Sequence, residues 1–317
     1  MKPFFSIIIP VRVSNSYLSQ TKRSLKSQTF KDFELLVITD KISKTSSPAI
    51  KRNIGAKQAL GKYLVFLDDD SYPSRSWLKK IRKQIKLHPN YSAFCGPALT
   101  PPKNNIFQKA SGLVWSSILG SGGAGTYRNK PMSSRFVSDY PTVNFIVKKS
   151  DFTKIGGFDP NHWPGEDTLL CLKLIQSKMK IFYHPSIVVY HHRRSIIIPH
   201  LKQISRYALH RGHFARIFPD NSRKLSYFIP SIFFLYILSI PITHFLYPLC
   251  LYVLFLLLTF IDFLIKKNNL FLSILATISI PPTHLCYGLL FMVGFLKKDL
   301  GYKSHRVNKS TGHYIGG

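Results

Sequence analysis

The fold of this chain follows from one stretch, Gly61-Lys62-Tyr63-Leu64-Val65-Phe66-Leu67-Asp68-Asp69-Asp70. Its apolar run shows no polar alternation, which is typical of a strand buried in a parallel sheet. Side chains at the carboxyl end of such a strand lie where α/β sheets bind ligands. In extended backbone Asp68 and Asp70 would share one face and Asp69 would point to the other. The stretch therefore predicts an α/β domain with a ligand site at this strand end; a solvated Asp-rich turn is the alternative.

Acidic residues are scarce in this chain, yet they cluster. There are 14 acidic residues against 44 basic ones, and residues 68–70 and 166–167 together hold five of the 14. Carboxylates this close repel one another unless a positive charge lies between them, and hard oxygen ligands suit a divalent cation. We therefore expect a metal site at the first cluster and a second carboxylate pair for chemistry. The alternative for the pair is a helix N-terminus, because residues 167–178 have helical spacing.

The surrounding segments alternate between strand and helix patterns. We expect strands at residues 5–11, 33–40 and 63–67, and helices at residues 17–28 and 49–60. This order is typical of a parallel, doubly wound sheet. A Gly-x-Gly-x-x-Gly motif does not follow the first strand, which disfavours a dinucleotide fold.

The composition changes abruptly near residue 226. Residues 227–265 are almost unbroken apolar sequence, about twice the length that one spanning helix needs, and residues 270–296 resume the pattern after Lys266-Lys267-Asn268-Asn269. This indicates a membrane region; a buried helical hairpin is the alternative. The apolar run at residues 4–11 is too short for a signal peptide, so we expect the domain before the membrane region to stay in the cytoplasm.

Basic pairs flank the apolar segments and indicate their orientation. Positive flanks prefer the cytoplasmic side, so Arg223-Lys224, Lys266-Lys267 and Lys297-Lys298 predict two hairpins, the second short enough to be re-entrant. A hydropathy count gives three helices instead, and the possible crossings number two to four. The net charge of +30 favours anionic lipid head groups or a phosphate-bearing substrate. A nucleic-acid role is not expected, because no recognition motif accompanies the charge.

Five motifs in order resemble the family-2 glycosyltransferases, over about residues 4–215. These enzymes have a GT-A fold. The segment Tyr207-Ala208-Leu209-His210-Arg211-Gly212-His213 resembles the Arg/Gly-rich neck of succinoglycan-type bacterial membrane glycosyltransferases. The motifs are Ser6-Ile7-Ile8-Ile9-Pro10-Val11, Leu25-Lys26-Ser27-Gln28-Thr29, Arg52-Asn53-Ile54-Gly55, Phe66-Leu67-Asp68-Asp69-Asp70, and Gly156-Gly157-Phe158-Asp159 followed by Gly165-Glu166-Asp167. The resemblance implies a GT-A domain over residues 1–222 with an interfacial basic helix at 200–222. The composition adds the expectation of transmembrane hairpins over 223–300 and a basic polar tail over 301–317.

The resemblance also implies roles for individual residues. Asp167 would be the general base, and Glu166 would orient substrate beside it. Asp68 and Asp70 would hold Mn²⁺ or Mg²⁺, with His191 as a third ligand unless His191 belongs only to a basic surface patch. The donor nucleotide would be contacted by Pro10, Asp40, Arg52, Asp68 and Asp69, although Lys41-Ile42-Ser43 departs from the second Asp and the Ser that many relatives carry there. The acceptor side would involve Gln203, Arg206 and Tyr207.

The expected function is therefore that of an inverting, metal-dependent glycosyltransferase in the cytoplasmic (inner) membrane. It would be a multi-pass protein with its catalytic domain on the cytoplasmic side. Its partners would be a nucleotide-sugar donor, a lipid-linked (polyprenyl-diphosphate) saccharide acceptor of cell-surface polysaccharide synthesis, and membrane lipids. The alternatives are a processive polysaccharide synthase, a polyprenyl-phosphate monoglycosyltransferase and, in a different class, a non-catalytic scaffold of a polysaccharide-assembly complex.

Overall fold

The chain divides between two structural units in the computed structural model, which describes residues 2–123, 125–301, 306–307 and 314–315. The first unit comprises residues 1–99, 131–191 and 301–317, and the second comprises residues 100–130 and 192–300. The expected interfacial helix at residues 200–222 thus belongs to the second unit, as does the segment from 100 to 130. Most of the expected tail at residues 301–317 lies outside the described residues.

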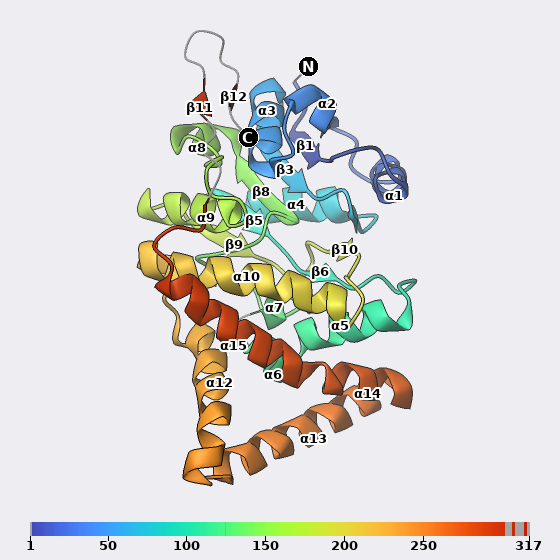
Figure 1. Ribbon diagram of the computed structural model, residues 1–317. Helices are drawn as coiled ribbons and strands as arrows, with labels where there is room; N and C mark the ends of the chain where they lie inside the picture. The colour runs from blue at the N-terminus through green and yellow to red at the C-terminus, as the bar shows by residue number, and fades with distance from the viewer. Residues whose placement is uncertain (1, 124, 302–305, 308–313, 316–317) are drawn as a thin grey trace. The chain divides into compact units, whose positions relative to one another are not determined.

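The first unit contains a mixed sheet in the order β2-β1-β3-β8-β5-β9-β7 (Figure 1). Strand β1 runs parallel to β2 and β3, whereas β8 is antiparallel to β3 and β5. This confirms the predicted α/β class. The bounds are β1 Phe5–Pro10, β2 Phe33–Ile38, β3 Tyr63–Leu67, β5 Ala93–Cys95, β7 Arg135–Val137, β8 Asn144–Lys148 and β9 Ile181–Tyr183. Smaller sheets join β4 (Ser71–Pro73), β10 (Val189–His191) and β6 (Ala98–Leu99), and β11 (Arg306–Val307) with β12 (Tyr314–Ile315).

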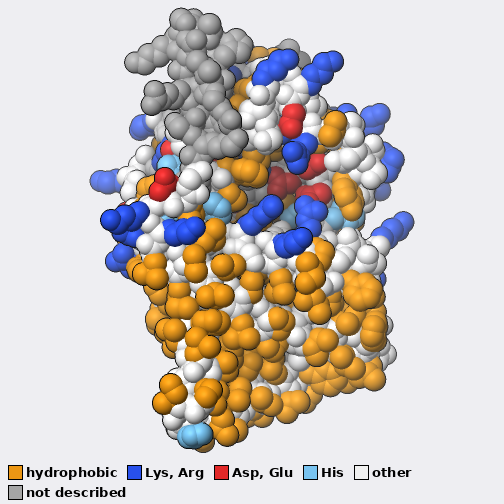
Figure 2. All heavy atoms as spheres, in the orientation of Figure 1, with side chains coloured by type: hydrophobic (Ala, Val, Ile, Leu, Met, Phe, Trp, Pro, Cys, Tyr) orange, Lys and Arg blue, Asp and Glu red, His pale blue; other side chains and the backbone are white. Residues whose placement is uncertain are grey.

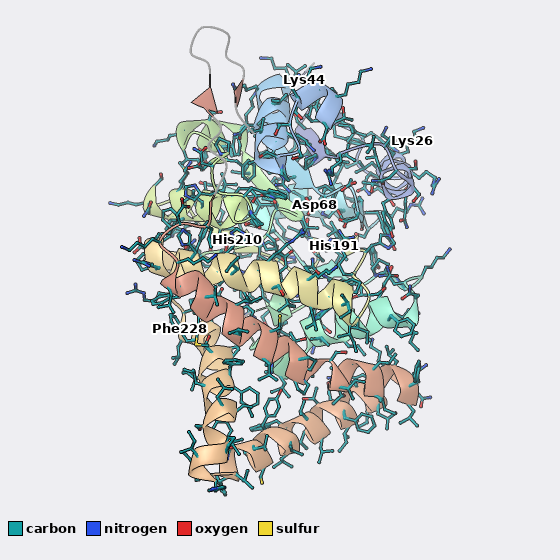
Figure 3. All side chains as sticks on the ribbon, in the orientation of Figure 1. Lys26, Lys44, Asp68, His191, His210 and Phe228 are labelled. Atoms are coloured by element: carbon teal, nitrogen blue, oxygen red, sulfur yellow. The ribbon has the colours of Figure 1, made fainter. Side chains whose placement is uncertain are left out.

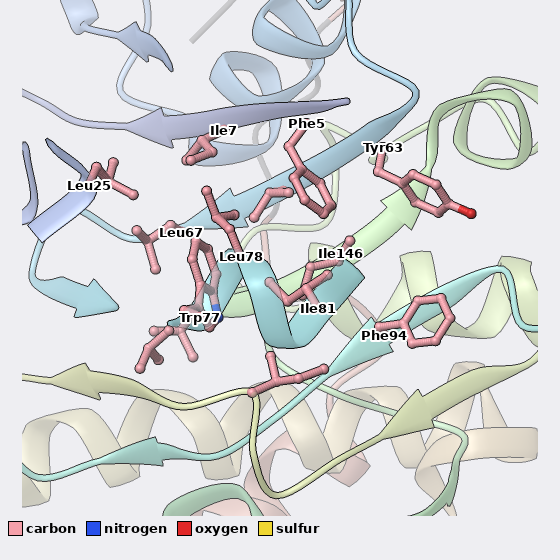
Figure 4. Close-up of a cluster of buried hydrophobic side chains, with 14 of the residues drawn as sticks. Phe5, Ile7, Leu25, Tyr63, Leu67, Trp77, Leu78, Ile81, Phe94 and Ile146 are labelled. Carbon is pink, nitrogen blue, oxygen red and sulfur yellow. The ribbon is translucent and has the colours of Figure 1, made fainter. Parts of the chain in front are cut away.

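Alternation along β1 places helices on both faces of the main sheet. Ile7 is buried in one core with Leu25 of α1 and Trp77 of α4 (Figure 4). Ile8 faces α3 instead, where a Cβ at Gly55 would lie 2.6 Å from the Ile8 Cγ2 atom. The absent side chain therefore lets α3 pack close to β1. The helices of this unit are α1 Ser16–Lys26, α2 Asp40–Ser43, α3 Pro48–Gln58, α4 Trp77–Leu87, α8 Lys149–Lys154 and α9 Glu166–Gln176.

The second unit is helical. Three of its stretches are long and apolar enough to cross a membrane, Leu225–Thr243, Tyr247–Lys267 and Leu270–Leu296, and hydrophobic side chains cover the surface of its C-terminal helices (Figure 2). The helices are α5 Ile106–Ser116, α6 Ile118–Ser121, α7 Thr126–Asn129, α10 Ile198–Ile217, α11 Pro219–Ser222, α12 Leu225–Thr243, α13 Tyr247–Lys267, α14 Leu270–Ile278 and α15 Ile280–Leu296.

The second expected hairpin is a bent helix in the structure. Helices α12 and α13 follow one another through a turn at residues 244–246, where the Tyr236 hydroxyl donates to the Phe245 carbonyl at 2.9 Å, and they diverge beyond this turn (Figure 1). In contrast, α14 passes directly into α15 at Ser279. Pro281 and Pro282 occupy the first turn of α15, where a helix needs no N–H donor. These prolines therefore begin a helix inside the segment that the sequence analysis expected to form the second hairpin.

Candidate functional site

The three aspartates after β3 form a turn, not an extended segment. Strand β3 ends at Leu67, and Ser71 closes the turn by donating from its backbone N–H (3.2 Å) and its hydroxyl (2.8 Å) to the Asp68 carbonyl. The prediction that Asp68 and Asp70 share one face assumed extended backbone and does not apply to this turn. Each of the three carboxylates instead has its own side-chain partner.

Arg52 is buried between carboxylates from two distant parts of the chain. Its Nη2 lies 2.8 Å from Asp68 Oδ1, and its Nη1 lies 2.8 Å from Glu166 Oε1. Burial lowers the pKa of Arg52, but the charges of Asp68 and Glu166 raise it by more, so the net pKa is above the usual value. The planar guanidinium, with donors on both sides, can serve the two carboxylates at once. Arg52 thus joins the turn after β3 to the start of α9.

Glu166 and Asp167 occupy the first turn of α9 but differ in exposure. Glu166 is 6% exposed, and burial together with the charge of Asp167 raises its pKa to about 7, against the opposing effect of Arg52. Asp167 is half-buried, and its Oδ1 accepts a hydrogen bond from the Thr168 backbone N–H at 2.7 Å. Both carboxylates therefore lie at a helix N-terminus, and Asp167 is the more exposed of the two.

Asp69 is held by Asn15, a residue that the sequence analysis did not select. The Asn15 Nδ2 donates to Asp69 Oδ2 at 2.8 Å, while its Oδ1 caps α1 by accepting from Leu18 N–H at 2.8 Å. Burial raises the pKa of Asp69, the Asn15 hydrogen bond opposes this, and the charges of Asp70 and Asp68 add to it. Asn15 precedes an amphipathic helix in the sequence, which is the usual signal of an N-cap, but nothing in that signal indicates a contact with Asp69.

Asp70 and His191 come together through the small sheet, where Ser71 of β4 pairs with His191 of β10. Figure 3 labels His191 and Asp68, which begins the same turn as Asp70. Asp70 Oδ1 lies 3.1 Å from His191 Nε2. A carboxylate beside an imidazole fits Mn²⁺ in donor type. Among the residues that the structure describes, no three His, Cys, Asp or Glu side chains form a complete metal site. Asp70 and His191 thus supply two side-chain donors of the types that a divalent ion takes.

Pro10 and Asp40 lie at the carboxyl ends of β1 and β2. Pro10 is the buried last residue of β1, and Asp40, predicted as the last residue of the second strand, instead begins α2, because β2 ends at Ile38. Asp40 forms an ion pair with the buried Lys51, whose ammonium also donates to the Val11 carbonyl at 3.0 Å. Lys51 is a second residue that the sequence analysis missed, because a lysine beside Arg52 gives no sign that it is buried.

Asn53 links the motif at residues 52–55 to the loop that contains the glycine pair at residues 156–157. Its Nδ2 donates to the Phe158 carbonyl at 2.8 Å, and its Oδ1 accepts from the Phe158 N–H at 3.0 Å. Gly157, with φ of +68°, allows the loop to turn under this amide. In Arg52-Asn53-Ile54-Gly55, the first residue therefore binds carboxylates, the second holds a loop, and the last packs on β1.

The expected acceptor-side residues lie on α10 in the second unit, whereas the carboxylates belong to the first. Gln203 Nε2 donates to the Tyr207 hydroxyl at 3.3 Å, one helical turn away. The Tyr207 ring packs edge-on against Trp115 of α5, with the centroids 6.0 Å apart. Arg206 is exposed on the same helix. These three residues form a polar and aromatic surface within the second unit.

Comparison with known proteins relates this chain to glycosyltransferases. A model of glycosyl transferase family group 2 matches residues 63–293. A pre-mycofactocin glycosyltransferase of Mycobacterium tuberculosis is 27% identical over 155 residues, which are 48% of this chain and 31% of that protein. An uncharacterized glycosyltransferase of Rickettsia conorii is 37% identical over 102 residues, which are 26% of this chain and 16% of that protein. The chain thus covers less than a third of the length of either relative.

A solved structure extends the similarity. The mannosyltransferase PcManGT from Pyrobaculum calidifontis, in complex with GDP-Man and Mn²⁺, has a TM-score of 0.59 at 14% sequence identity. The alignment covers 94% of this chain and 89% of that one. At this identity the match shows a shared fold, and it agrees with the predicted GT-A class.

Proposed function

This chain belongs to glycosyl transferase family group 2, and from this premise we propose that it transfers a sugar from a nucleotide-sugar donor to a lipid-linked saccharide, with inversion at the anomeric carbon. The observation that carries the proposal is the Arg52 bridge. It holds Asp68, at the end of β3, and Glu166, next to Asp167, in one buried cluster. A donor-binding edge and a candidate base are thereby joined in the first unit.

Asp167 is the proposed general base. The acceptor hydroxyl oxygen would form a bond to the anomeric carbon while its proton passes to Asp167 and the bond to the diphosphate breaks, with the electron pair leaving on the diphosphate. Proton transfer to a positioned carboxylate contributes about 10²–10⁴-fold to such a rate. Glu166 is buried and paired with Arg52, so we assign it a supporting role beneath Asp167.

Asp70 and His191 are the proposed protein ligands of Mn²⁺ or Mg²⁺, with Asp68 available from the same turn. When bound, the ion would neutralise charge that develops on the leaving diphosphate. The complex of PcManGT with GDP-Man and Mn²⁺ supports a nucleotide sugar and a divalent ion as the partners of this fold. Pro10, Asp40 and Asp69 are the proposed lining of the nucleotide pocket.

A lipid-linked acceptor is the part of the proposal that draws on the second unit. Its apolar helices would place the protein in a membrane, and the basic pairs that flank them favour a cytoplasmic catalytic unit. Helix α10 carries Gln203, Arg206 and Tyr207 immediately before these helices in the chain. We assign them to the acceptor because a cationic, aromatic surface suits a sugar attached to a lipid diphosphate.

The test is nucleotide release by detergent-purified protein, with a panel of nucleotide sugars, a short polyprenyl-diphosphate saccharide, and Mn²⁺, Mg²⁺ or EDTA. We expect release with one donor that stops in EDTA. Asp167→Asn should lower turnover by about 10²-fold or more and leave nucleotide binding intact, whereas Asp70→Asn should weaken binding of the metal. Asp151→Asn, a half-buried aspartate on α8, is the matched control and should behave as wild type.

The outcomes separate an enzyme from a scaffold. Full activity in Asp167→Asn would remove the assigned base. If no donor is turned over and no nucleotide binds, a non-catalytic role in a membrane complex becomes the better account of this architecture. Product stereochemistry, read by nuclear magnetic resonance of the released glycan, tests inversion separately.

A further inference from the structure

The three apolar stretches of the second unit differ in burial. In their most apolar windows, 6% of the residues are buried for Leu225–Thr243 and for Tyr247–Lys267, but 33% are buried for Leu270–Leu296. A helix that crosses a membrane in a small bundle exposes most of its surface to lipid, as the first two do. The third stretch therefore has a protein neighbour along much of its length.

Its main neighbour is α10, which lies along α15 from one end to the other (Figure 1). Helix α12 also contacts α15, where the Ser231 hydroxyl donates to the Gly288 carbonyl at 2.9 Å, and α5 packs against α14. At the first end His200 Nε2 lies 3.1 Å from Thr283 Oγ1, and further along Ser205 Oγ lies 3.1 Å from Cys286 Sγ. At the last end Arg216 donates to the Leu296 carbonyl at 2.9 Å. From one contact to the next, the residue numbers increase along both helices, so α10 and α15 run parallel.

Glycines bring the two backbones into direct contact between these ends. A Cβ at Gly294 would lie 1.9 Å from the Leu209 carbonyl oxygen, and a Cβ at Gly212 would lie 2.0 Å from the Phe291 carbonyl oxygen. Contacts this close require glycine, as in tightly packed helix pairs. Because the two backbones touch at these glycines, α15 must run in the same direction as α10.

Helix α10 is unsuited to the hydrocarbon layer. Lys202 lies near its first end, Arg206 near its middle and Arg216 at its last turn, and all three are exposed. Charged side chains are costly inside a bilayer. If α15 crossed the membrane, α10 would cross beside it and carry these charges through the apolar layer.

We propose that α14 and α15 form an in-plane segment that contacts lipid from one side of the bilayer, and that only α12 and α13 enter the hydrocarbon layer. Helix α14 has nine residues, or about 14 Å of length, against a layer of about 30 Å. Its exposed apolar residues include Phe271, Ile274 and Ile278, and Leu289 continues the apolar surface on α15. These side chains would sit at the boundary between head groups and acyl chains.

The arrangement makes the number of crossings even. The chain would enter after Arg223-Lys224, return at Lys266-Lys267, and keep Lys297-Lys298 on that same side. All three basic pairs then face one compartment, in agreement with the positive-inside rule. If all three apolar stretches crossed the membrane, Lys297-Lys298 would instead lie on the side opposite to the other two basic pairs. The inference does not depend on the proposed reaction.

A cross-link tests the packing in the membrane. Ser205→Cys in a Cys250→Ser background should form an intramolecular disulfide with the native Cys286 on mild oxidation of the full-length protein in its membrane. Lys202→Cys, exposed on the same helix, is the matched control and should remain reduced. Absence of the disulfide in the first variant would overturn the parallel packing of α10 and α15.

Labelling tests the sidedness. Cysteine replaces Lys26, Lys267 or Lys298, one at a time, in a background with Cys250→Ser and Cys286→Ser, in which the two remaining native cysteines, Cys95 and Cys171, are buried. A membrane-impermeant maleimide is then added to sealed vesicles of known orientation. We expect all three to react from the same side. Reaction of Lys298→Cys from the side opposite to Lys26→Cys would establish an odd number of crossings and overturn the proposal, whatever the activity of the protein.

Discussion

Arg52 determines the electrostatic state of the carboxylate cluster. Its guanidinium is 4% exposed and contacts Asp68 and Glu166 at 2.8 Å each. A buried ion pair of this kind adds little net stability, but removing Arg52 leaves Glu166 buried without a counter-charge, so that Glu166 must either stay charged or take up a proton. We therefore expect the loss of Arg52 alone to destabilise the protein more than the loss of Arg52 together with the Glu166 carboxylate.

Replacing Arg52 by Met should therefore lower the free energy of unfolding by about 3–5 kcal/mol. Adding Glu166→Gln should recover part of the loss, because the buried side chain is then neutral. Thermal unfolding of the detergent-solubilised variants measures both effects. Lys57→Met, an exposed position on the same helix, is the control; an equal loss there and at Arg52, or no recovery in the double variant, would contradict the assignment.

The residues of the site were predictable in unequal degree. Residues 68–70 and 166–167 stand out because acids are rare in this chain and follow a buried strand or begin a helix. The contact between Arg52 and Glu166 spans 114 residues, and no local pattern encodes it. The same holds for Asn15 with Asp69. Three consecutive aspartates are compatible with both a strand and a turn, so their partners could be found only in the folded chain.

Among the helices and strands, the prediction was correct where burial determines the hydrophobic pattern of the sequence. Strand β3 occupies Tyr63–Leu67 as expected, because a continuous apolar run has few alternatives. The second membrane hairpin was not found, because a proline pair reads equally well as a break and as a helix start. What decides between these is packing, and α15 has its packing partner on α10, more than 60 residues earlier in the chain.

His200 lies in that packing layer and supplies a pH test of it. It is 1% exposed, with Nδ1 2.8 Å from Ser111 Oγ and Nε2 3.1 Å from Thr283 Oγ1. Burial lowers the pKa of His200 from 6.5 to about 4. The unfolded chain therefore binds a proton more readily between these values, so stability is present above pH 6.5 and is lost as the pH falls towards 4.

The expected loss over this window is roughly 3 kcal/mol, from 1.36 kcal/mol per pKa unit. His200→Gln keeps a polar side chain that does not titrate, so it should flatten the dependence of melting temperature on pH between 4 and 6.5. His162→Gln, in the first unit, should leave the slope of the wild type. An unchanged slope in His200→Gln would show that the buried imidazole is not the group responsible.

For the whole molecule, the dominant physical property is the net charge of +30. Exposed cations lie on α10 at Lys202, Arg206 and Arg216, and two more, Lys297 and Lys298, follow α15. If α10 and α15 lie along the membrane plane, these cations face the lipid head groups together. Basic residues at an anionic membrane surface contribute about 1 kcal/mol each, so several of them in one plane amount to a substantial preference for anionic lipid.

The melting temperature should accordingly be higher in nanodiscs of anionic lipid than in nanodiscs of zwitterionic lipid. Added salt should shrink the difference, because exposed charges are screened over about 10 Å at 0.1 M ionic strength and over about 3 Å at 1 M. Lys297→Gln with Lys298→Gln should reduce the difference, whereas Lys22→Gln with Lys26→Gln, which removes two exposed charges from α1, should not, since only the former pair adjoins the proposed in-plane segment. If both substitutions had the same effect, the lipid preference would follow from net charge alone. A selective effect of the first pair would instead tie it to the plane that α10 and α15 define.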